Sequence, residues 1–313
     1  MRRFIALLTI VLACAAPVSA RAGEAMTVIL DWFVNPDHAP LIVALEQGYF
    51  AEAGLDVELV APADPNDPPK LVAAGMADLA VSYQPQLYVQ VHEGLPLIRV
   101  GTLIASPLNS LVVLADGPVD DIADLRGRKI GYSVGGFEDA LLRTMLERHG
   151  VSLDEVELVN VNFSLSPALI AGQVDAVIGA FRNFELNQLD LEGYEGRAFY
   201  VEEEGVPPYD ELILVANRET LDRSKVRRFL DALERGVLFL VNHPEESWVL
   251  FTEAYPDLDD ELNRLAWRDT LPRFALSPGA LDRNRYARFA LYLTAMGLID
   301  EARAVDAYAL EVE

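Results

Sequence analysis

Short apolar runs alternate with amphipathic segments along the chain. Residues 27–31, 54–60 and 78–81 are typical of short strands that lie buried between other elements. Between these strands, residues 39–47 and 68–74 place apolar side chains at helical spacing. This β-α-β-α-β alternation predicts a doubly wound sheet with helices on its faces.

Two segments repeat the same local pattern. Residues 71–81 and 169–179 each read as a helix ended by Gly, two linking residues, an aspartate and a buried strand. Such a turn also recurs by chance in α/β proteins. The second copy, however, belongs to its own β-α-β series, which starts at residues 129–132 and continues through a helix over 138–149. The repeat therefore predicts two lobes of related build.

The order of these elements predicts how the chain divides. We expect lobe one to contain residues 25–108 and 216–313, and lobe two to contain residues 114–211. The chain would cross between the lobes near residues 109–113 and 212–216, and these crossings would form a hinge. Ligand sites favour clefts between lobes and the carboxyl ends of parallel strands. The predicted fold class is therefore α/β, with two doubly wound lobes around a cleft.

Aromatic and amide side chains follow most of the predicted strands. They occur in residues 31–38, 82–85, 109–110, 131–138, 160–163, 181–185 and 207–211. Flat rings suit a planar heterocycle, and amides with a carboxylate can pair with ring nitrogens and amino groups. A single such ring is more often part of the core, but the recurrence at so many strand ends indicates a ligand site.

The segment over residues 131–138 offers a second interpretation. Gly135 and Gly136 suit either a tight turn or an anion nest at the start of a helix. Glu138 in the first helical turn would oppose an anion, so we favour the turn.

The N-terminus has the pattern of a secretion signal. A positively charged start precedes an apolar run over residues 4–13, and residues 18–20 give the small-x-small cleavage pattern. We therefore expect residues 1–20 to be a signal peptide that directs export to the periplasm. The single cysteine, Cys14, lies in this leader, and residues 11–14 loosely resemble a lipoprotein box. Lipid anchoring through Cys14 is the alternative.

Composition narrows the class of protein further. A formal net charge of −24 repels nucleic acid and anionic lipid, and a hydrophobic content of 51% argues against disorder. If cleavage follows Ala20, the mature chain has no thiol, which excludes thiol catalysis and cysteine-ligated metals. The 4 histidines lack a zinc-pair spacing, and no Gly-x-Ser-x-Gly elbow occurs. We therefore expect no metal, no cofactor and no catalytic residues.

These segments together resemble the thiamine-pyrimidine-binding proteins of bacterial ABC importers. The resemblance is carried by residues 30–39, 44–57, 83–85, 108–110, 125–132, 157–161, 175–180 and 205–212. It covers nearly the whole mature chain. It implies a type II periplasmic-binding-protein fold and capture of a thiamine precursor, formylaminopyrimidine or hydroxymethylpyrimidine. It also implies delivery to an ABC permease in the membrane, and we expect a monomer that closes about its hinge.

The resemblance also implies which residues contact the ligand. The candidates are Trp32, Asn35, His38, Tyr83, Gln84, Asn109, Arg182, Asn183, Glu185 and Tyr209. Glu185 would pair with the pyrimidine amino group and ring nitrogen, and Trp32 and Tyr83 would stack on the ring. Gln84 stands where the family often has Glu, and Arg182 where it often has Trp. Arg182 would suit a phosphate or carboxylate that the usual pyrimidine lacks. Close relatives also serve other flat vitamins, so riboflavin is the alternative ligand.

The same superfamily includes the eukaryotic synthase that builds the thiamine pyrimidine from pyridoxal phosphate and its own histidine. That synthase has a lysine, and a histidine four residues later, where this chain has Ser82 and Gln86. The lysine is needed to form the aldimine. The synthase also has a cysteine cluster for iron, which the mature chain lacks. His38 alone cannot perform that chemistry, so we expect a binding protein and not an enzyme.

Overall fold

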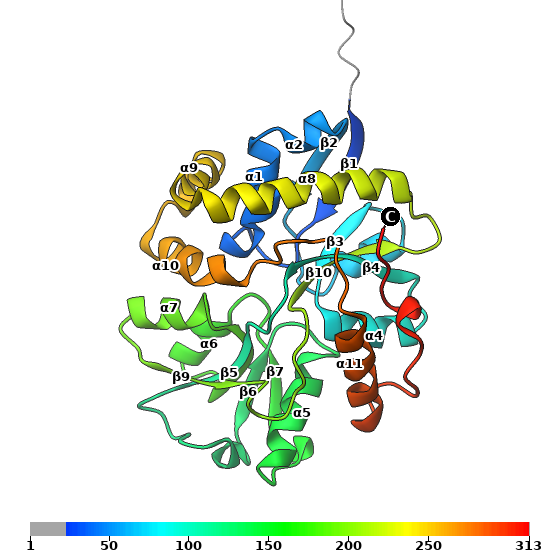
Figure 1. Ribbon diagram of the computed structural model, residues 1–313. Coiled ribbons are helices and arrows are strands. Elements are labelled where there is room, and N and C mark those ends of the chain that lie inside the picture. Colours follow the sequence, from blue (N-terminus) through cyan, green and yellow to red (C-terminus); the bar gives the residue numbers. More distant parts are fainter. Residues whose placement is uncertain (1–22, 313) are drawn as a thin grey trace, which may run out of the picture.

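The computed structural model describes residues 23–312, which form two α/β lobes (Figure 1). Each lobe contains a 5-stranded sheet, in the order β2-β1-β3-β10-β4 in lobe one and β7-β6-β8-β5-β9 in lobe two. The strands of lobe one are β1 (Glu24–Ile29), β2 (Leu55–Val60), β3 (Leu79–Ser82), β4 (Leu97–Ile104) and β10 (Leu212–Asn217). The strands of lobe two are β5 (Asn109–Leu114), β6 (Lys129–Tyr132), β7 (Glu157–Asn160), β8 (Ala176–Phe181) and β9 (Gly196–Tyr200). The expected signal peptide, residues 1–20 with Cys14, lies outside the described residues.

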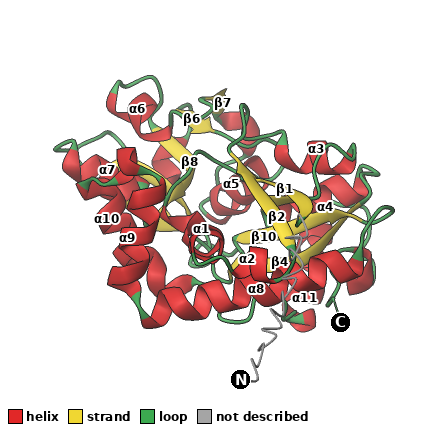
Figure 2. Ribbon diagram, turned by 90° about the horizontal axis from the view of Figure 1, so that it is seen from above, coloured by secondary structure: helices red, strands yellow, loops and turns green. Residues whose placement is uncertain are grey.

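Helices surround both sheets, as the view in Figure 2 shows. Lobe one contains α1 (Ala39–Glu46), α2 (Tyr49–Glu52), α3 (Pro68–Ala73) and α4 (Gln84–His92). Lobe two contains α5 (Glu138–Arg148), α6 (Leu165–Ile170) and α7 (Glu185–Leu191). The C-terminal part forms α8 (Arg223–Asn242), α9 (Pro244–Ala254), α10 (Glu261–Thr270) and α11 (Arg283–Ala295). Within residues 23–312, no helix has both the length and the apolar character that a membrane span requires.

The two sheets share one arrangement of strands. The first three strands of each sheet are parallel, and an antiparallel strand follows them. That strand is β10 beside β3 in lobe one and β5 beside β8 in lobe two. In both lobes, the chain reaches this strand directly after leaving the other lobe. The predicted fold of two doubly wound α/β lobes is confirmed.

The crossings between the lobes differ from the sequence prediction. Residues 109–113 lie in β5 and residues 212–216 lie in β10, whereas the chain crosses in residues 105–108 and 201–211. Residues 109–113 and 212–216 thus follow the crossings directly, in the first strand that the chain enters after each crossing. The side chains of these two segments are almost completely buried, and their backbone groups are paired with neighbouring strands.

An aspartate explains the sequence repeat. Asp78 Oδ2 accepts a hydrogen bond from Thr27 N at 2.9 Å, and Asp78 N donates to Thr27 O at 3.1 Å. In lobe two, Asp175 Oδ2 accepts from Lys129 N at 3.0 Å, and Asp175 N donates to Lys129 O at 2.8 Å. Each aspartate therefore joins the turn before the third parallel strand to the central one. The related local structure is one reason that the two lobes have the same strand order.

The C-terminal helices belong mainly to lobe one. Helix α8 packs along α1 and α2, while α10 contacts α7 of lobe two. The sequence does not predict α10. Asp260 caps this helix, because its Oδ1 accepts a hydrogen bond from Asn263 N at 2.8 Å. Helix α10 matters for the ligand site because Thr270, at its end, lies beside the cleft.

Candidate ligand-binding site

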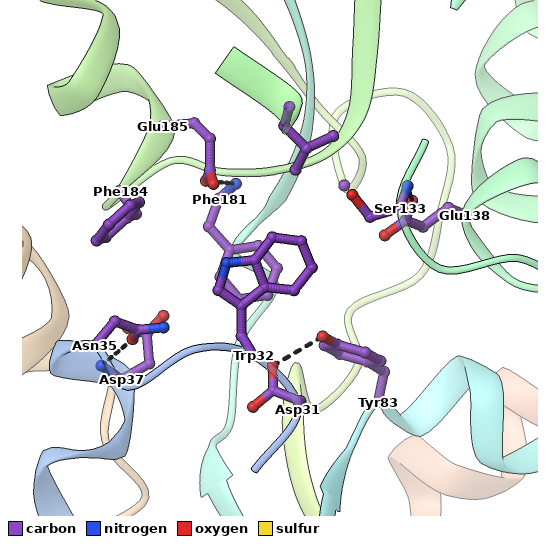
Figure 3. A pocket seen from close by; sticks show the side chains of 12 residues that line it. Asp31, Trp32, Asn35, Asp37, Tyr83, Ser133, Glu138, Phe181, Phe184 and Glu185 are labelled. Atoms are coloured by element: carbon purple, nitrogen blue, oxygen red, sulfur yellow. Dashed lines mark hydrogen bonds between the residues drawn. The ribbon is translucent and has the colours of Figure 1, made fainter. Parts of the chain in front are cut away.

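A pocket lies between the lobes where the carboxyl ends of their strands meet (Figure 3). The cavity between its side chains has a volume of about 30 Å³. Lobe one lines it with Asp31, Trp32, Asn35, Asp37 and Tyr83. Lobe two lines it with Ser133, Glu138, Leu165, Gly179, Phe181, Phe184 and Glu185.

The residues predicted to contact the ligand fall into two groups. Those that line the pocket are Trp32, Asn35, Tyr83 and Glu185. Those that do not are His38, Gln84, Asn109, Arg182, Asn183 and Tyr209. The members of the second group hold the pocket residues, the lobes or the crossings in place.

Trp32 and Tyr83 each contact an aromatic ring of the other lobe. The Trp32 and Phe163 ring centroids are 4.6 Å apart with the planes at 68°. Tyr83 stacks on Phe137 with the centroids 4.9 Å apart. Such pairs contribute about 0.5–1.5 kcal/mol beyond the burial of apolar area. Both pairs join the lobes, so the structure shows the cleft in a closed arrangement. Trp32 projects into the middle of the pocket, in position to stack on a planar ligand (Figure 3).

Asp31, at the pocket wall, is held by the side chains of His38 and Tyr83. His38 Nε2 lies 2.9 Å from Asp31 Oδ1, and the Tyr83 hydroxyl donates to Asp31 Oδ2 at 2.8 Å. The other ring nitrogen of His38 accepts a hydrogen bond from Asn35 N at 3.3 Å. With Nδ1 as the acceptor, Nε2 is the ring nitrogen that donates to Asp31 Oδ1. His38 is fully buried, and it orients Asp31 and Asn35.

Two buried glutamates face the pocket from the first residues of α5 and α7. Glu138 Oε2 accepts hydrogen bonds from Ser133 N at 2.9 Å and Val134 N at 3.2 Å. Glu185 Oε2 accepts a hydrogen bond from Phe181 N at 2.7 Å. Burial raises the pKa of each glutamate to about 8, although these hydrogen bonds lower it. At neutral pH the pocket therefore contains carboxyl groups that can donate as well as accept hydrogen bonds.

The carboxyl group of Asp37 forms a hydrogen bond between the two lobes. Asp37 Oδ1 accepts hydrogen bonds from Asn183 Nδ2 at 2.6 Å and from Thr270 Oγ1 at 3.0 Å. Asn183 belongs to lobe two, while Asp37 and Thr270 belong to lobe one. Burial raises the pKa of Asp37 to about 6, so it is mostly ionised at pH 7. The predicted residue Asn183 thus contacts the opposite lobe beside the pocket.

Asn109, Arg182 and Tyr209 lie at the crossings between the lobes. Glu211 Oε2 accepts hydrogen bonds from Leu108 N, Asn109 N and the Tyr209 hydroxyl. Arg182 donates to the carbonyl oxygens of Leu108 and Asn109, both at 3.3 Å. We call Leu108, Asn109, Arg182, Glu202, Tyr209 and Glu211 the hinge cluster.

Arg182 is fully engaged within the hinge cluster. Its guanidinium forms two hydrogen bonds with Glu202, at 2.7 and 2.8 Å, and lies 4.0 Å from the Tyr200 ring centroid. The hydrogen bonds with Glu202 raise the pKa of Arg182, although burial lowers it. Glu202 already supplies the carboxylate that Arg182 binds. A phosphate or carboxylate of a ligand therefore does not bind Arg182 in this arrangement.

Gln84 belongs to a buried polar group of lobe one. Its Oε1 accepts a hydrogen bond from Asp210 N at 2.7 Å, and its Nε2 donates to the Tyr88 hydroxyl at 3.4 Å. Asp210 also accepts a hydrogen bond from Thr102 Oγ1 at 2.9 Å. Gln84 therefore anchors the end of the second crossing to lobe one. The two departures from the family pattern, Gln84 and Arg182, lie outside the pocket lining.

The sequence reasoning did not select the other pocket carboxyl groups. Asp31, Asp37 and Glu138 lie in the segments that follow predicted strands, but the sequence predicts none of them as a ligand contact. The available signal was an acidic residue in the segment that follows a buried strand. That signal is weak in a chain with 49 Asp and Glu residues.

Comparison with known proteins places these features in a family. The chain matches the family described as NMT1/THI5 like over residues 35–247. This protein belongs to the NMT1/THI5-like family. A protein of Haemophilus influenzae whose name refers to thiamine biosynthesis is 54% identical over 100% of both chains. The formylaminopyrimidine-binding protein of Halalkalibacterium halodurans is 39% identical over 72% of this chain and 69% of its own length.

More distant members and solved structures complete the comparison. A 4-amino-5-hydroxymethyl-2-methylpyrimidine phosphate synthase of Legionella pneumophila is 26% identical over 88% of both chains. The alkanesulfonate-binding protein of Xanthomonas axonopodis has the same fold, with a TM-score of 0.71, 16% identity, and coverage of 92% of this chain and 98% of that one. The relatives of this chain thus include proteins named as binding proteins and proteins named as synthases.

Ser82 and Gln86, the positions where the sequence resemblance expects a lysine and a histidine in the synthase, lie beside the pocket. The Ser82 hydroxyl donates to Gln86 Oε1 at 3.0 Å, and both side chains are buried. Neither residue lines the pocket. In this NMT1/THI5-like protein, these positions therefore supply a hydrogen bond between α4 and the end of β3.

Proposed function

We propose that this protein is the substrate-binding component of an ABC importer that captures a pyrimidine precursor of thiamine. The ligand is formylaminopyrimidine or hydroxymethylpyrimidine. The observation that carries the proposal is the pairing of Glu185 with an aromatic wall in a pocket between two lobes. The relative named as a formylaminopyrimidine-binding protein supports the same ligand class.

The chemistry of an aminopyrimidine fits a protonated carboxyl group. Its ring nitrogen accepts a hydrogen bond, and its exocyclic amino group donates one. Burial raises the pKa of Glu185 to about 8, so this side chain can donate to the nitrogen and accept from the amino group. Trp32 provides the ring on which the pyrimidine stacks. Asn35 and Ser133 supply further polar groups from opposite lobes.

Closure of the lobes is the proposed mechanism of capture. Lobe one, residues 25–108 with 216–313, rotates against lobe two, residues 114–211, about the crossings. A ligand in the pocket touches both lobes and shifts the population to the closed form. The bond between Asp37 and Asn183 adds to the stability of that form. The closed monomer, exported to the periplasm, then docks on a membrane permease.

The enzyme interpretation is the second candidate, because some family members are named as synthases. Ser82 and Gln86 stand where the eukaryotic synthase has the lysine and histidine described above. A serine cannot form the aldimine with pyridoxal phosphate. These residues support a binding protein that performs no chemistry on its ligand. Riboflavin stays as an alternative ligand of the same class of protein.

A thermal-shift panel tests the proposal directly. The protein is heated with thiamine, each pyrimidine precursor, riboflavin or pyridoxal phosphate. A ligand at a hundredfold excess over its Kd stabilises the folded state by about 2.7 kcal/mol. We expect a higher melting temperature with a pyrimidine precursor. A response to riboflavin alone, or to no pyrimidine, would contradict the proposed ligand.

A further inference from the structure

The loop between β6 and α5 has its backbone donors occupied by the protein itself. A loop of this kind at the start of a helix can bind an anion, because its N–H groups point toward the ligand. Here Ser133 N and Val134 N both donate to Glu138 Oε2, at 2.9 and 3.2 Å. The carboxyl group of Glu138 therefore occupies the place that the anionic group of a ligand would take.

Gly179 makes room for this carboxyl group. Gly179 has a φ of +95°, and a Cβ at this position would lie 2.5 Å from Glu138 Oε1. No side chain fits there, and the left-handed φ itself favours glycine. Glu138 and Gly179 both line the pocket, so the fold places the carboxyl group at the pocket wall and leaves no side chain between them.

The rest of the pocket offers an anion no alternative partner. Phe181 N, in the corresponding loop before α7, donates to Glu185 Oε2. The lining residues within the described chain include Asp31, Asp37, Glu138 and Glu185, and none is a lysine, arginine or histidine. The guanidinium of Arg182 is paired with Glu202. A phosphate in this pocket would lose its water and gain no counter-charge.

We propose that Glu138 is a specificity-determining residue that excludes phosphorylated and other anionic forms of the ligand. The inference rests on the proposed function, because it concerns the same pocket. Glu138 already takes both N–H donors of the loop, so a ligand phosphate would be desolvated here without a partner, which opposes binding by several kcal/mol. We expect the phosphate monoester of hydroxymethylpyrimidine to bind roughly 100-fold more weakly than the alcohol.

Titration calorimetry on the full mature chain tests the proposal. The ligands are hydroxymethylpyrimidine, its phosphate monoester, pyridoxal phosphate and inorganic phosphate. The variants are Glu138→Ala, which frees both N–H groups, and Glu138→Gln, which cannot ionise but keeps an acceptor for them. Glu147→Gln, an exposed position on the same helix, is the matched control.

The decisive quantity is the ratio of the two affinities, alcohol over phosphate monoester. We expect Glu138→Ala to lower this ratio at least tenfold and Glu138→Gln to lower it less, with Glu147→Gln unchanged. A merely structural role would weaken both ligands equally and leave the ratio constant, which would overturn the proposal. Wild-type protein that binds the monoester as tightly as the alcohol would also overturn it.

The anion experiments separate this proposal from the proposed function. If wild-type protein binds no pyrimidine in any form, the proposed function fails. Glu138→Ala that then gains binding of pyridoxal phosphate or inorganic phosphate would still support the role of Glu138. The absence of that gain would contradict it. Should Glu138→Ala not fold, the comparison of wild type with Glu138→Gln decides the question.

Discussion

Asn183 of lobe two donates a hydrogen bond from Nδ2 to Oδ1 of Asp37 of lobe one at 2.6 Å. Both side chains are almost fully buried, and Asp37 lines the ligand pocket. Closure of the cleft therefore creates a buried polar contact at the edge of the site. Hydrogen bonds to charged groups contribute about 1.5–3 kcal/mol, so this contact can add substantially to the closed form.

Asn183→Ala tests this contribution. The variant leaves Asp37 without its partner in lobe two, and the closed form loses about 1.5–3 kcal/mol. We expect ligand affinity to fall roughly 10- to 100-fold. Titration calorimetry measures the affinity, and small-angle X-ray scattering measures ligand-induced closure. Asn242→Ala, at the exposed end of α8, is the control, and equal affinities in the two variants would remove Asn183 from the closure mechanism.

Glu185 gives a prediction about pH. Below pH 8 its carboxyl group carries the proton that the ring nitrogen needs, whereas above pH 8 binding must take up a proton. We expect pyrimidine affinity to be level up to about pH 8 and then to fall about tenfold per pH unit. Calorimetry in buffers from pH 6 to 10 measures this profile.

Two variants separate the roles of Glu185. Glu185→Ala removes both hydrogen bonds to the pyrimidine and should weaken binding by about 3 kcal/mol, or ~100-fold. Glu185→Gln keeps a donor at every pH. It should therefore keep most of the affinity for the pyrimidine, and its affinity should not fall above pH 8. If Glu185→Gln is as weak as Glu185→Ala, the ionised carboxylate is the binding form. Glu192→Gln, exposed after α7, is the control.

The buried carboxyl groups also predict how stability depends on pH. Burial raises the pKa of Asp37 to about 6, of Glu211 to about 7, and of Glu138 and Glu185 to about 8. The folded protein therefore binds more protons than the unfolded chain between pH 4 and 8. Stability must fall as pH rises through this range.

The melting temperature of the ligand-free protein measures this effect. We expect it to be higher at pH 5 than at pH 8, and we expect Glu138→Gln to reduce the difference. A melting temperature that rises from pH 5 to pH 8 would show that these groups are ionised in the folded protein. The exposed Glu147→Gln variant should follow the wild type.

A variant of Arg182 tests whether this residue contacts the ligand or has a structural role. Arg182→Ala removes the ion pair with Glu202 and the bonds to Leu108 and Asn109. We expect a loss of about 1–3 kcal/mol in unfolding free energy, with an unchanged order of ligand preference. Urea unfolding and the thermal-shift panel measure the two quantities. A changed ligand preference would instead place Arg182 in the site, while Arg197→Ala removes an exposed ion pair as the control.

Substitutions of Gly179 and Glu138 should have non-additive effects on the free energy of unfolding. Gly179→Ala forces a Cβ to within 2.5 Å of Glu138 Oε1 at a φ of +95°, which should cost roughly 2–4 kcal/mol. Adding Glu138→Ala removes the clash but not the backbone strain, so the double variant should recover part of this loss. Gly135→Ala is the control, because its Cβ would meet nothing closer than 3.7 Å. Additive effects measured by urea unfolding would contradict the contact.

The sequence by itself determined the architecture of this protein. Apolar runs and helical spacing depend on local chemistry, so they identified the parallel strands of both sheets and several helices. The repeat around Asp78 and Asp175 indicated two lobes of related build, because the same turn needs the same residues. The family resemblance, carried by motifs along the chain, selected Glu185, Trp32 and Tyr83, which do line the pocket.

Only the tertiary structure decided which strand-end residues face the pocket. The ligand cleft and the crossings adjoin the same edge of each sheet, so sequence position alone does not separate them. Asn109, Arg182 and Tyr209 belong to the hinge cluster, whereas Glu138 reaches the pocket because Gly179, about forty residues away, lacks a side chain. Such choices depend on long-range contacts between the lobes, and the local pattern of residues does not contain them.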